Sequence, residues 1–312
     1  MKAILKYLAV MTLALAGIFS SAEDSPAAGE KVIIAIIPEI NLVKQMERFI
    51  PLCDYMKAKT GVEVEVKPMS NYGQIYEEMR NGNIDAGFFG SFVYALTRAR
   101  IGIEPIARPV DLGGRSTYSG ITFVRKDSGI KNPAGMKGKT IALVDPSTTG
   151  GYLAQKEYLK NNGVDIDNDL KIYWAGSHEA AIRAVLNGQA DIGGAKDTIV
   201  KKARKENRVF DSIATILDET PRNKVPDNIF AVRKGLDRTI LEKMKKVLLG
   251  MNSDPQGKKV LAKFGATKFI TTTDNDFRSL YNLITHLNID LQSYTYKKDM
   301  LSSPNRKGKE QK

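Results

Sequence analysis

The chain has a single cysteine, Cys53, and therefore cannot form an internal disulfide. Cys53 stands beside Phe49 and Leu52, a setting in which a lone cysteine behaves as a small buried hydrophobe. The sequence has only two histidines, and no cluster of cysteine and histidine has the spacing of a metal site. The Gly-x-Ser-x-Gly pattern of a hydrolase nucleophile is absent as well. These absences exclude a disulfide scaffold and give no basis for a metal, a cofactor or a catalytic residue.

Long apolar runs are also scarce, and the one that approaches a dozen residues stands near the N-terminus. A basic start precedes this run at 8–19, and small residues follow it up to Ala22. This order is typical of a secretory signal, so we expect 1–22 to be a signal peptide cleaved near Ala22, with Ala27 or Ala28 as alternatives. A membrane anchor is the competing interpretation, but the run is shorter than the ~20 residues that span a bilayer. Since no cysteine stands near the cleavage site for lipid attachment, the sequence predicts a soluble protein exported to the periplasm.

Acidic residues are outnumbered, which gives the chain a formal net charge of +12. Part of the basic excess is local, in 201–208 and in a C-terminal tail at 297–312. A solvated helix face and a basic tail explain these stretches, and attraction to an anionic partner or a membrane surface is the alternative. No aromatic residues are interleaved with these charges, so nucleic-acid binding is not indicated.

Short apolar strands alternate with amphipathic helices along the chain. We expect strands at 31–37, 62–66, 84–89, 103–110, 140–144, 170–174 and 190–193, and helices at 42–59, 72–80, 92–98, 152–161 and 179–186. Further helices are expected from about 233 onwards. This alternation predicts an α/β protein with two mixed, mostly parallel sheets flanked by helices.

A short internal sequence repeat indicates two lobes of similar structure. The sequence Asn-Gly-Asn-Ile-Asp-Ala-Gly at 81–87 returns as Asn-Gly-Gln-Ala-Asp-Ile-Gly at 187–193. In both copies a helix is expected to end at the glycine, which can adopt the left-handed conformation of a helix cap, and a strand follows. We expect the first lobe to contain 30–118 plus 233–296 and the second to contain 119–232, joined by two hinge strands near 118–124 and 226–232. Two lobes joined in this way close on a ligand by hinge motion.

The strongest local signal is the segment Asp-Pro-Ser-Thr-Thr-Gly-Gly-Tyr at 145–152, which follows an expected strand and opens a helix. Ser147, Thr148, Thr149 and Gly150 would present hydroxyl and backbone N–H donors at a helix start, where the helix dipole favours an anion. A plain helix cap is the alternative, but one hydroxyl suffices for capping. The segment therefore predicts a site for a phosphate-like anion.

A second candidate is His178, in the sequence Gly-Ser-His-Glu at 176–179. It lies between an expected strand and an expected helix, at the same sheet edge as Ser147 if the sheet is parallel. Ligands in such sheets bind outside the carboxyl ends of the strands. Helix capping by the Ser177-His178 pair is the alternative.

Five further residues lie at strand ends, loops or expected hinges. Ser91 opens a helix, while Tyr72 and Tyr118 are aromatic residues for which simple packing is equally possible. Asp197 and Asp227 are acidic residues at element ends. A carboxylate facing an anion is costly unless it receives an ammonium group, so these two residues raise the question of an amine on the ligand.

At these residues the chain resembles the phosphate, phosphite and phosphonate substrate-binding proteins of ABC transporters. The likeness covers nearly all of the chain after the signal and is most specific at 147–151, 176–180 and 187–191, with 81–91 adding to it. It implies the type II periplasmic-binding-protein fold, in which two lobes close on a ligand.

The resemblance also implies roles for individual residues. The family's ligand-binding hydroxyls fall on Ser147, Thr148 and Thr149, its histidine on His178, and its pocket tyrosines on Tyr72 and Tyr118. Carboxylates that hold the amine of aminoalkylphosphonates fall on Asp227 and on Asp197 or its neighbour Thr198. The family commonly has Gly-Pro where this chain has Gly90-Ser91, so Ser91 is expected to make a different contact.

The sequence thus predicts a monomeric periplasmic binding protein that captures a small phosphorus oxyanion and delivers it to an ABC permease in the inner membrane. Two alternatives stay open. A ligand-sensing partner of a membrane receptor or kinase would share the fold, and a secreted phosphoester or phosphonate hydrolase would use Ser147 with His178. We expect no enzyme activity, because no third group is identified that would orient the histidine.

Overall fold

The computed structural model describes residues 31–207, 209–217 and 224–295, so the predicted signal peptide and basic tail lie outside the described residues. The strands are β1 (Lys31–Ile36), β2 (Glu63–Pro68), β3 (Ala86–Phe89), β4 (Glu104–Asp111), β5 (Thr117–Tyr118), β6 (Gly120–Arg125), β7 (Thr140–Leu143), β8 (Lys171–Trp174), β9 (Ile192–Lys196), β10 (Ala214–Ile216), β11 (Val225–Pro226), β12 (Ile229–Val232) and β13 (Ala266–Thr271). The helices are α2 (Leu42–Thr60), α3 (Gln74–Arg80), α4 (Ser91–Ile101), α5 (Ala154–Asn161), α6 (His178–Leu186), α7 (Asp197–Glu206), α8 (Phe210–Ile213), α9 (Arg238–Gly250), α10 (Pro255–Phe264) and α11 (Arg278–His286), and a π-helical turn, η3 (Thr149–Leu153), precedes α5. The alternation predicted from the sequence is therefore confirmed, with boundaries shifted by one or a few residues.

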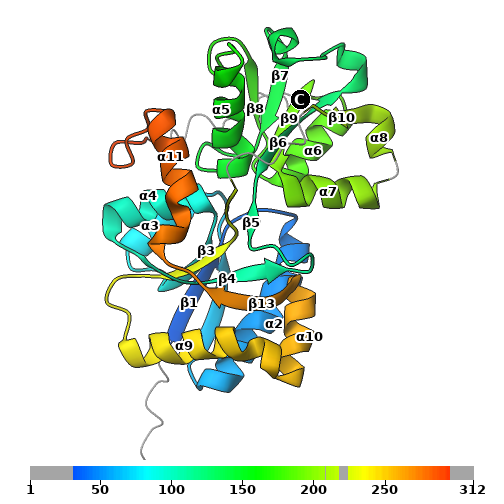
Figure 1. The fold of residues 1–312 in the computed structure, drawn as a ribbon. Helices are drawn as coiled ribbons and strands as arrows, with labels where there is room; N and C mark the ends of the chain where they lie inside the picture. The colour runs from blue at the N-terminus through cyan, green and yellow to red at the C-terminus, as the bar shows by residue number, and fades with distance from the viewer. Residues whose placement is uncertain (1–30, 208, 218–223, 296–312) are drawn as a thin grey trace, which may run out of the picture. The chain divides into compact units, whose positions relative to one another are not determined.

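Two larger sheets organise these elements (Figure 1). One has the strand order β13-β4-β12-β3-β1-β2, and the other has the order β10-β6-β9-β7-β8. Parallel pairing is confined to the three-stranded groups β2-β1-β3 and β8-β7-β9, and the strands outside these groups run antiparallel to their neighbours. The prediction of mixed sheets is confirmed, but the sheets are not mostly parallel. The strands next to the crossing between the sheets, β4, β6, β10 and β12, and the edge strand β13 pair in antiparallel fashion.

The two sheets are joined through a short antiparallel pair, β5 with β11. After β5 the chain continues into β6 of the five-stranded sheet, and after β11 it continues into β12 of the six-stranded sheet. The predicted hinge segments 118–124 and 226–232 are thus each divided between the β5–β11 pair and the sheet strand that follows it, β6 or β12. The turn between β11 and β12 contains Asn228 with a positive φ of 35°, a conformation that asparagine tolerates better than most residues.

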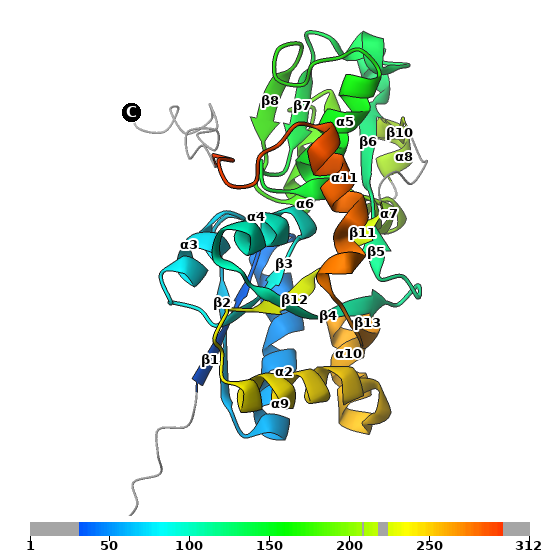
Figure 2. The same cartoon turned by 60° about the vertical axis from the view of Figure 1, so that its left-hand side comes forward.

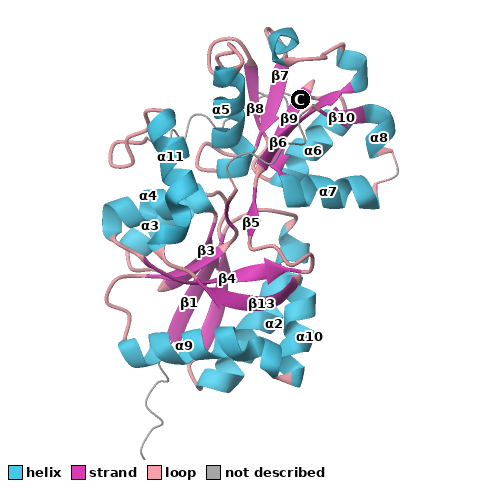
Figure 3. Ribbon diagram, viewed as in Figure 1, coloured by secondary structure: helices cyan, strands magenta, loops and turns pink. Residues whose placement is uncertain are grey.

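Helices flank the sheets (Figure 3). On one face of the six-stranded sheet, α2, α9 and α10 bury apolar side chains at helical spacing, among them Phe49, Leu52 and Met56 of α2. Phe49 meets Phe88 of β3 edge-on with ring centroids 5.0 Å apart, and each such buried side chain contributes about 1.5–3 kcal/mol. Cys53 lies in this core as predicted, and burial raises the pKa of its thiol to about 12.

The repeated Asn-Gly segment has the same structure in both copies. Gly82 and Gly188 both adopt a left-handed backbone, with φ of 73° and 75°, at the ends of α3 and α6. A strand follows each cap and lies within the parallel group of its own sheet. The internal repeat found in the sequence therefore forms the same helix-to-strand connection beside each of the two sheets.

The C-terminal part of the chain contains the helices expected there, as α9, α10 and α11. It also contains β13, which was not expected and which pairs with β4 at the edge of the six-stranded sheet. The helix α11 then leads from the end of β13 towards α5 and packs against α5 and η3, beside the other sheet (Figures 1 and 2). Residues 233–295 therefore contact the six-stranded sheet through β13 and the helical elements α5 and η3 beside the five-stranded sheet through α11. Within the described part of the chain, no helix combines the length and apolar character that crossing a bilayer requires.

Candidate functional site

Several of the predicted site residues follow the carboxyl ends of parallel strands in the two sheets. In the five-stranded sheet, Ser147 comes after β7 and His178 after β8. In the six-stranded sheet, Tyr72 comes after β2 and Ser91 directly after β3 and Gly90. Parallel strands end at a common sheet edge, and that edge is where ligands of open α/β sheets bind. Each sheet thus presents one such edge to the candidate site.

The predicted anion-binding segment forms a tight, buried turn. Ser147, Thr148 and Thr149 are at most 4% exposed. The Thr148 hydroxyl donates to the Asp145 carbonyl over 2.7 Å, and the Ser147 N–H donates to the Asp145 Oδ1 over 2.7 Å. Thr148 is the residue before the π-helical turn η3, yet its side chain makes no capping hydrogen bond. A plain helix cap therefore does not account for these hydroxyls, and the first N–H groups of the helix are left without intrahelical partners.

Two glycines let this turn approach its neighbours closely. A Cβ on Gly151 would lie 2.4 Å from the Cβ of Val144, and a Cβ on Gly150 would lie 3.1 Å from the Tyr118 ring. Gly150 also lies against the backbone of Lys196, at the end of β9. The glycines thus set the helix start directly against the strand that crosses between the sheets.

His178 is the first residue of α6 and is 3% exposed. Ser177 caps this helix by accepting from the Ala180 N–H over 3.1 Å, which leaves His178 free of a capping role. The backbone N–H of Lys196 donates to the His178 Nδ1 over 3.1 Å. Since Nδ1 accepts a hydrogen bond, the neutral ring carries its proton on Nε2, which is a donor. Burial lowers the pKa of His178 to about 4, so the ring is neutral near pH 7.

Two buried hydroxyls, those of Tyr72 and Thr149, have no hydrogen-bond partner among the described residues. Burial raises the pKa of Tyr72 well above its usual value, and the nearby charges of Glu39 and Asp145 act in the same direction, so the phenol keeps its proton. The Tyr118 hydroxyl lies near Thr149, but the Thr149 Oγ1 has no partner in hydrogen-bonding geometry. An unsatisfied buried hydroxyl costs about 1–3 kcal/mol, which a ligand oxygen would recover.

A buried ion-pair cluster lies beside these groups and was not predicted from the sequence. The Lys196 ammonium lies 3.2 Å from the Glu39 Oε1 and pairs with the Asp227 Oδ1. It also lies over the Tyr118 ring, 4.6 Å from the centroid. The Asn228 amide donates to the Glu39 Oε2 over 2.6 Å. The cluster therefore connects the end of β9 in one sheet with the residues after β1 and β11.

The charged groups of this cluster shift the pKa values of one another. Burial alone would lower the pKa of Lys196, but Asp227 and Glu39 raise it above its usual value. Burial likewise favours neutral Glu39, but the ammonium of Lys196, the Asn228 hydrogen bond and other nearby positive charge together outweigh it, so the pKa of Glu39 falls to about 2. The pKa of Asp227 is raised by its burial despite the Lys196 charge. Lys196 and Glu39 are thus a charged pair at neutral pH.

Ser91 and Tyr118 occupy the crossing between the sheets. The Ser91 hydroxyl is fully buried and donates to the Pro226 carbonyl over 2.5 Å. Burial raises the pKa of Tyr118, and the Lys196 ammonium opposes this shift. Ser91 therefore contacts the hinge backbone. The Tyr118 ring lies against both the Lys196 ammonium and the turn at Gly150.

Asp197, the neighbour of Lys196, is engaged elsewhere. Its Oδ1 accepts from the Ser119 N–H over 3.1 Å, and its Oδ2 lies 3.4 Å from Arg115 and 3.2 Å from Lys201. Both carboxylate oxygens thus have protein partners outside the Lys196 cluster. Asp227, in contrast, lies within that cluster.

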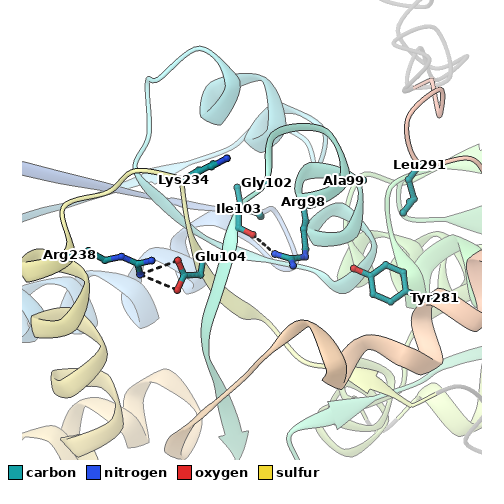
Figure 4. Close-up of a pocket in the computed structure, with 9 residues that line it drawn as sticks. All are labelled: Arg98, Ala99, Gly102, Ile103, Glu104, Lys234, Arg238, Tyr281 and Leu291. Carbon is teal, nitrogen blue, oxygen red and sulfur yellow. Dashed lines mark hydrogen bonds and ion pairs between the residues drawn. The ribbon is translucent and has the colours of Figure 1, made fainter.

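A surface hollow of about 570 Å³ lies apart from these residues (Figure 4). Its lining consists of Arg98, Ala99, Gly102, Ile103, Glu104, Lys234, Arg238, Tyr281 and Leu291. Arg238 pairs with Glu104 at 3.3 Å, and Arg98 donates to the Ile103 carbonyl over 2.9 Å. These arginines are already engaged, and the candidate site residues do not line the hollow. Among the described residues, no group of histidine, cysteine and carboxylate side chains could hold a metal ion.

Comparison with known sequences finds a family throughout most of the chain. Residues 34–277 match the model of a family described as the periplasmic substrate-binding protein of a phosphonate ABC transporter. The phosphate-import protein PhnD of Mycolicibacterium smegmatis is 29% identical over 241 residues, covering 72% of either chain. The phosphonates-binding periplasmic protein of Escherichia coli is 25% identical over 277 residues, covering 85% of this chain and 80% of its own.

Solved structures share the fold. PhnD1 of Prochlorococcus marinus in complex with methylphosphonate matches with a TM-score of 0.73 at 22% identity, covering 83% of this chain and 98% of its own. A binding-protein component of a phosphonate ABC transporter from Pseudomonas aeruginosa matches with a TM-score of 0.75 at 22% identity, covering 83% of this chain and 87% of its own. The type II periplasmic-binding fold expected from the sequence is confirmed by these neighbours.

Proposed function

Because the chain belongs to the periplasmic substrate-binding proteins of phosphonate ABC transporters, we propose that it binds a small phosphorus oxyanion between its two sheets and delivers it to the permease of an importer. The ligand is a phosphonate, phosphite or phosphate. Relatives with methylphosphonate bound and with a phosphate-import role support this range. The binding residues we assign are Ser147, Thr148, Thr149, Gly150, His178, Tyr72 and Tyr118.

The observation that carries this proposal is the set of unused donors at the site. The hydroxyls of Tyr72 and Thr149 are buried without partners among the described residues, and they follow strands of different sheets, β2 and β7. The Nε2–H of neutral His178 and the backbone N–H groups at the start of η3 add to them. An oxyanion accepts hydrogen bonds at every oxygen, so it satisfies donors of both sheets at once and stabilises their closed arrangement.

Catalysis by Ser147 and His178 does not fit the hydrogen bonds of the histidine. The Nδ1 of His178 accepts from the Lys196 N–H, and the neutral ring therefore carries its proton on Nε2. A nitrogen that already holds a proton cannot accept the proton of a serine hydroxyl. Binding explains the same groups without this conflict.

Isothermal titration and thermal unfolding with methylphosphonate, phosphite, phosphate and sulfate test the proposal. A ligand at about 100 times its dissociation constant stabilises the protein by about 2.7 kcal/mol. We expect Thr149→Val to weaken binding of the preferred phosphorus compound about tenfold. The matched control is Thr97→Val, which alters a buried threonine whose hydroxyl bonds to the Val93 carbonyl within α4, and it should bind normally. Absence of binding by every phosphorus compound in the panel would refute the proposal.

We further propose that export removes the segment 1–22 by cleavage near Ala22 and that the mature protein is a monomer. The order of basic, apolar and small residues at the N-terminus supports the cleavage. The intact mass of protein recovered from the periplasm gives the cleavage site, and light scattering gives the oligomeric state. A mature protein that retains the first 22 residues would refute this part of the proposal.

A further inference from the structure

The acidic side chains of the site have protein donors already. Glu39 receives the Lys196 ammonium on one oxygen and the Asn228 amide on the other. Asp227 receives the same ammonium. Asp197 is held by the Ser119 N–H and by two surface cations, as described above.

The burial of these groups makes the arrangement a fixed part of the site. The Lys196 side chain is 5% exposed, and those of Glu39 and Asp227 are 11% and 15% exposed. A buried carboxylate without a partner is costly, so both carboxylates hold the lysine in place. The Tyr118 ring, 4.6 Å from the ammonium, covers it further.

What the site offers to a ligand is therefore a set of hydrogen-bond donors and one fixed positive charge. The donors are the hydroxyls of Tyr72 and Thr149 and the Nε2–H of His178. A ligand ammonium placed here would meet the ammonium of Lys196, and both carboxylates that could receive it are already occupied. Like charges brought together in an interface disfavour binding strongly.

We propose that Lys196 takes the place that a ligand amine would otherwise fill, so that the site selects phosphorus oxyanions without an amino group. The ligand class is then inorganic phosphate or phosphite and simple alkylphosphonates, and aminoalkylphosphonates are excluded. This inference rests on the proposed function and specifies its substrate. It also explains how Glu39 and Asp227 can lie beside an anion site, since the Lys196 ammonium offsets one carboxylate charge and burial raises the pKa of Asp227.

Matched pairs of ligands test the inference on the unaltered protein. Ethylphosphonate and aminomethylphosphonate form one pair, and propylphosphonate and 2-aminoethylphosphonate form another, because in each pair an ammonium replaces a methyl group. We expect titration calorimetry to give the alkyl member at least about tenfold tighter binding. An amino compound that binds as tightly as its alkyl partner, or more tightly, would overturn the inference.

A variant of the lysine provides the converse test. In Lys196→Met, Glu39 and Asp227 lose their shared cation and become acceptors for a ligand amine. We expect the preference within each pair to shift towards the amino member by about tenfold or more, and 2-aminoethylphosphonate to raise the unfolding temperature more than propylphosphonate does. The control Lys202→Met alters an exposed lysine paired with Glu206 and should keep the preference of the parent.

The outcomes separate this inference from the function on which it rests. If methylphosphonate, phosphite and phosphate all fail to bind, the proposed function is wrong and the inference falls with it. If they bind but the amino compounds bind equally well, only the inference is wrong. The ligand pairs decide this on the parent protein, so the result stands even if Lys196→Met does not fold.

Discussion

The backbone N–H of Lys196 donates a hydrogen bond to the Nδ1 of His178 over 3.1 Å, and this bond determines which nitrogen of the imidazole holds the proton. It also connects the ends of two strands in one sheet, because Lys196 ends β9 and His178 follows β8. The residue that carries the buried ammonium thus also orients the histidine that we assign to ligand binding.

The burial of His178 predicts a pH dependence of stability. Its pKa is lowered to about 4 from an ordinary value near 6.5, so between these values the unfolded chain takes up a proton that the folded chain does not. The free energy of unfolding should therefore fall as pH falls from about 6.5 to 4, by up to about 3 kcal/mol from this group. Urea unfolding across this range, compared with His178→Asn, measures the contribution, which the variant should lack.

The exposed histidine serves as the control for that experiment. His286→Asn removes a side chain that bonds to Asn161 at the protein surface, and it should keep the slope of the parent between pH 6.5 and 4. A parent slope that is unchanged in His178→Asn would show that the buried histidine does not cause it.

The unpartnered hydroxyl of Tyr72 predicts that binding and stability respond differently to its removal. Tyr72→Phe should weaken oxyanion binding by about 1–1.5 kcal/mol and leave the free energy of unfolding without ligand unchanged or slightly higher, because the hydroxyl has no partner to lose in the part of the chain that the structure describes. In Tyr55→Phe the effects should be reversed, since the Tyr55 hydroxyl donates to Asp254 over 2.7 Å, away from the site. That variant should lose about 1 kcal/mol of stability and bind normally. Titration calorimetry and urea unfolding measure the two quantities.

The buried position of Glu39 predicts a larger stability cost than a surface ion pair would give. Glu39→Gln removes a charge that faces Lys196 and should lower the free energy of unfolding by about 1–3 kcal/mol in urea titrations. The control Glu65→Gln removes the partner of Lys31 in an exposed pair, and it should change stability very little. Equal effects of the two substitutions would contradict the structural role assigned to Glu39.

The close approach at Gly151 predicts that even a methyl group is not tolerated. A Cβ there would lie 2.4 Å from the Cβ of Val144 and 2.6 Å from the Thr148 hydroxyl, so Gly151→Ala should destabilise the protein by about 2 kcal/mol or more and distort the oxyanion site. Gly250→Ala, at the end of α9, meets no atom within 4 Å and should be neutral or stabilising by about 0.5 kcal/mol. Thermal unfolding of both variants, with a crystal structure of the first if it folds, provides the measurement.

Much of the fold could be predicted because its signals are local. Apolar periodicity gave the order of strands and helices, and the Asn-Gly caps at Gly82 and Gly188 marked the matching steps of the two sheets. The strand β13 could not be predicted in this way, since Lys268 interrupts its apolar pattern and its pairing with β4 at a sheet edge is long-range.

The site was predictable only where its residues stand at strand ends in the sequence. Lys196 also stands there, but a lysine is usually exposed, and only Glu39 and Asp227 make its burial possible. These partners are 157 and 31 residues away along the chain, so the sequence alone gave no sign of the pair. Asp197 was predicted as a site residue, but its carboxylate bonds to Ser119, Arg115 and Lys201 outside the Lys196 cluster. Successive residues at a helix start point in different directions, so Lys196 and Asp197 have different neighbours.

The chain beyond α11 has a consequence for the cost of binding. The Tyr294 hydroxyl donates to the Pro146 carbonyl over 2.7 Å, directly before Ser147, and the Arg100 Nε donates to the Leu291 carbonyl over 3.0 Å. The loop that carries the hydroxyls, at 147–149, is thereby held in position by residues 291–294, which are themselves bound to α4. The conformational entropy of this loop is lost when the protein folds, and it need not be lost again when a ligand binds. A preorganised loop of this kind lets a ligand with very few atoms, each able to make only a few contacts, still bind tightly.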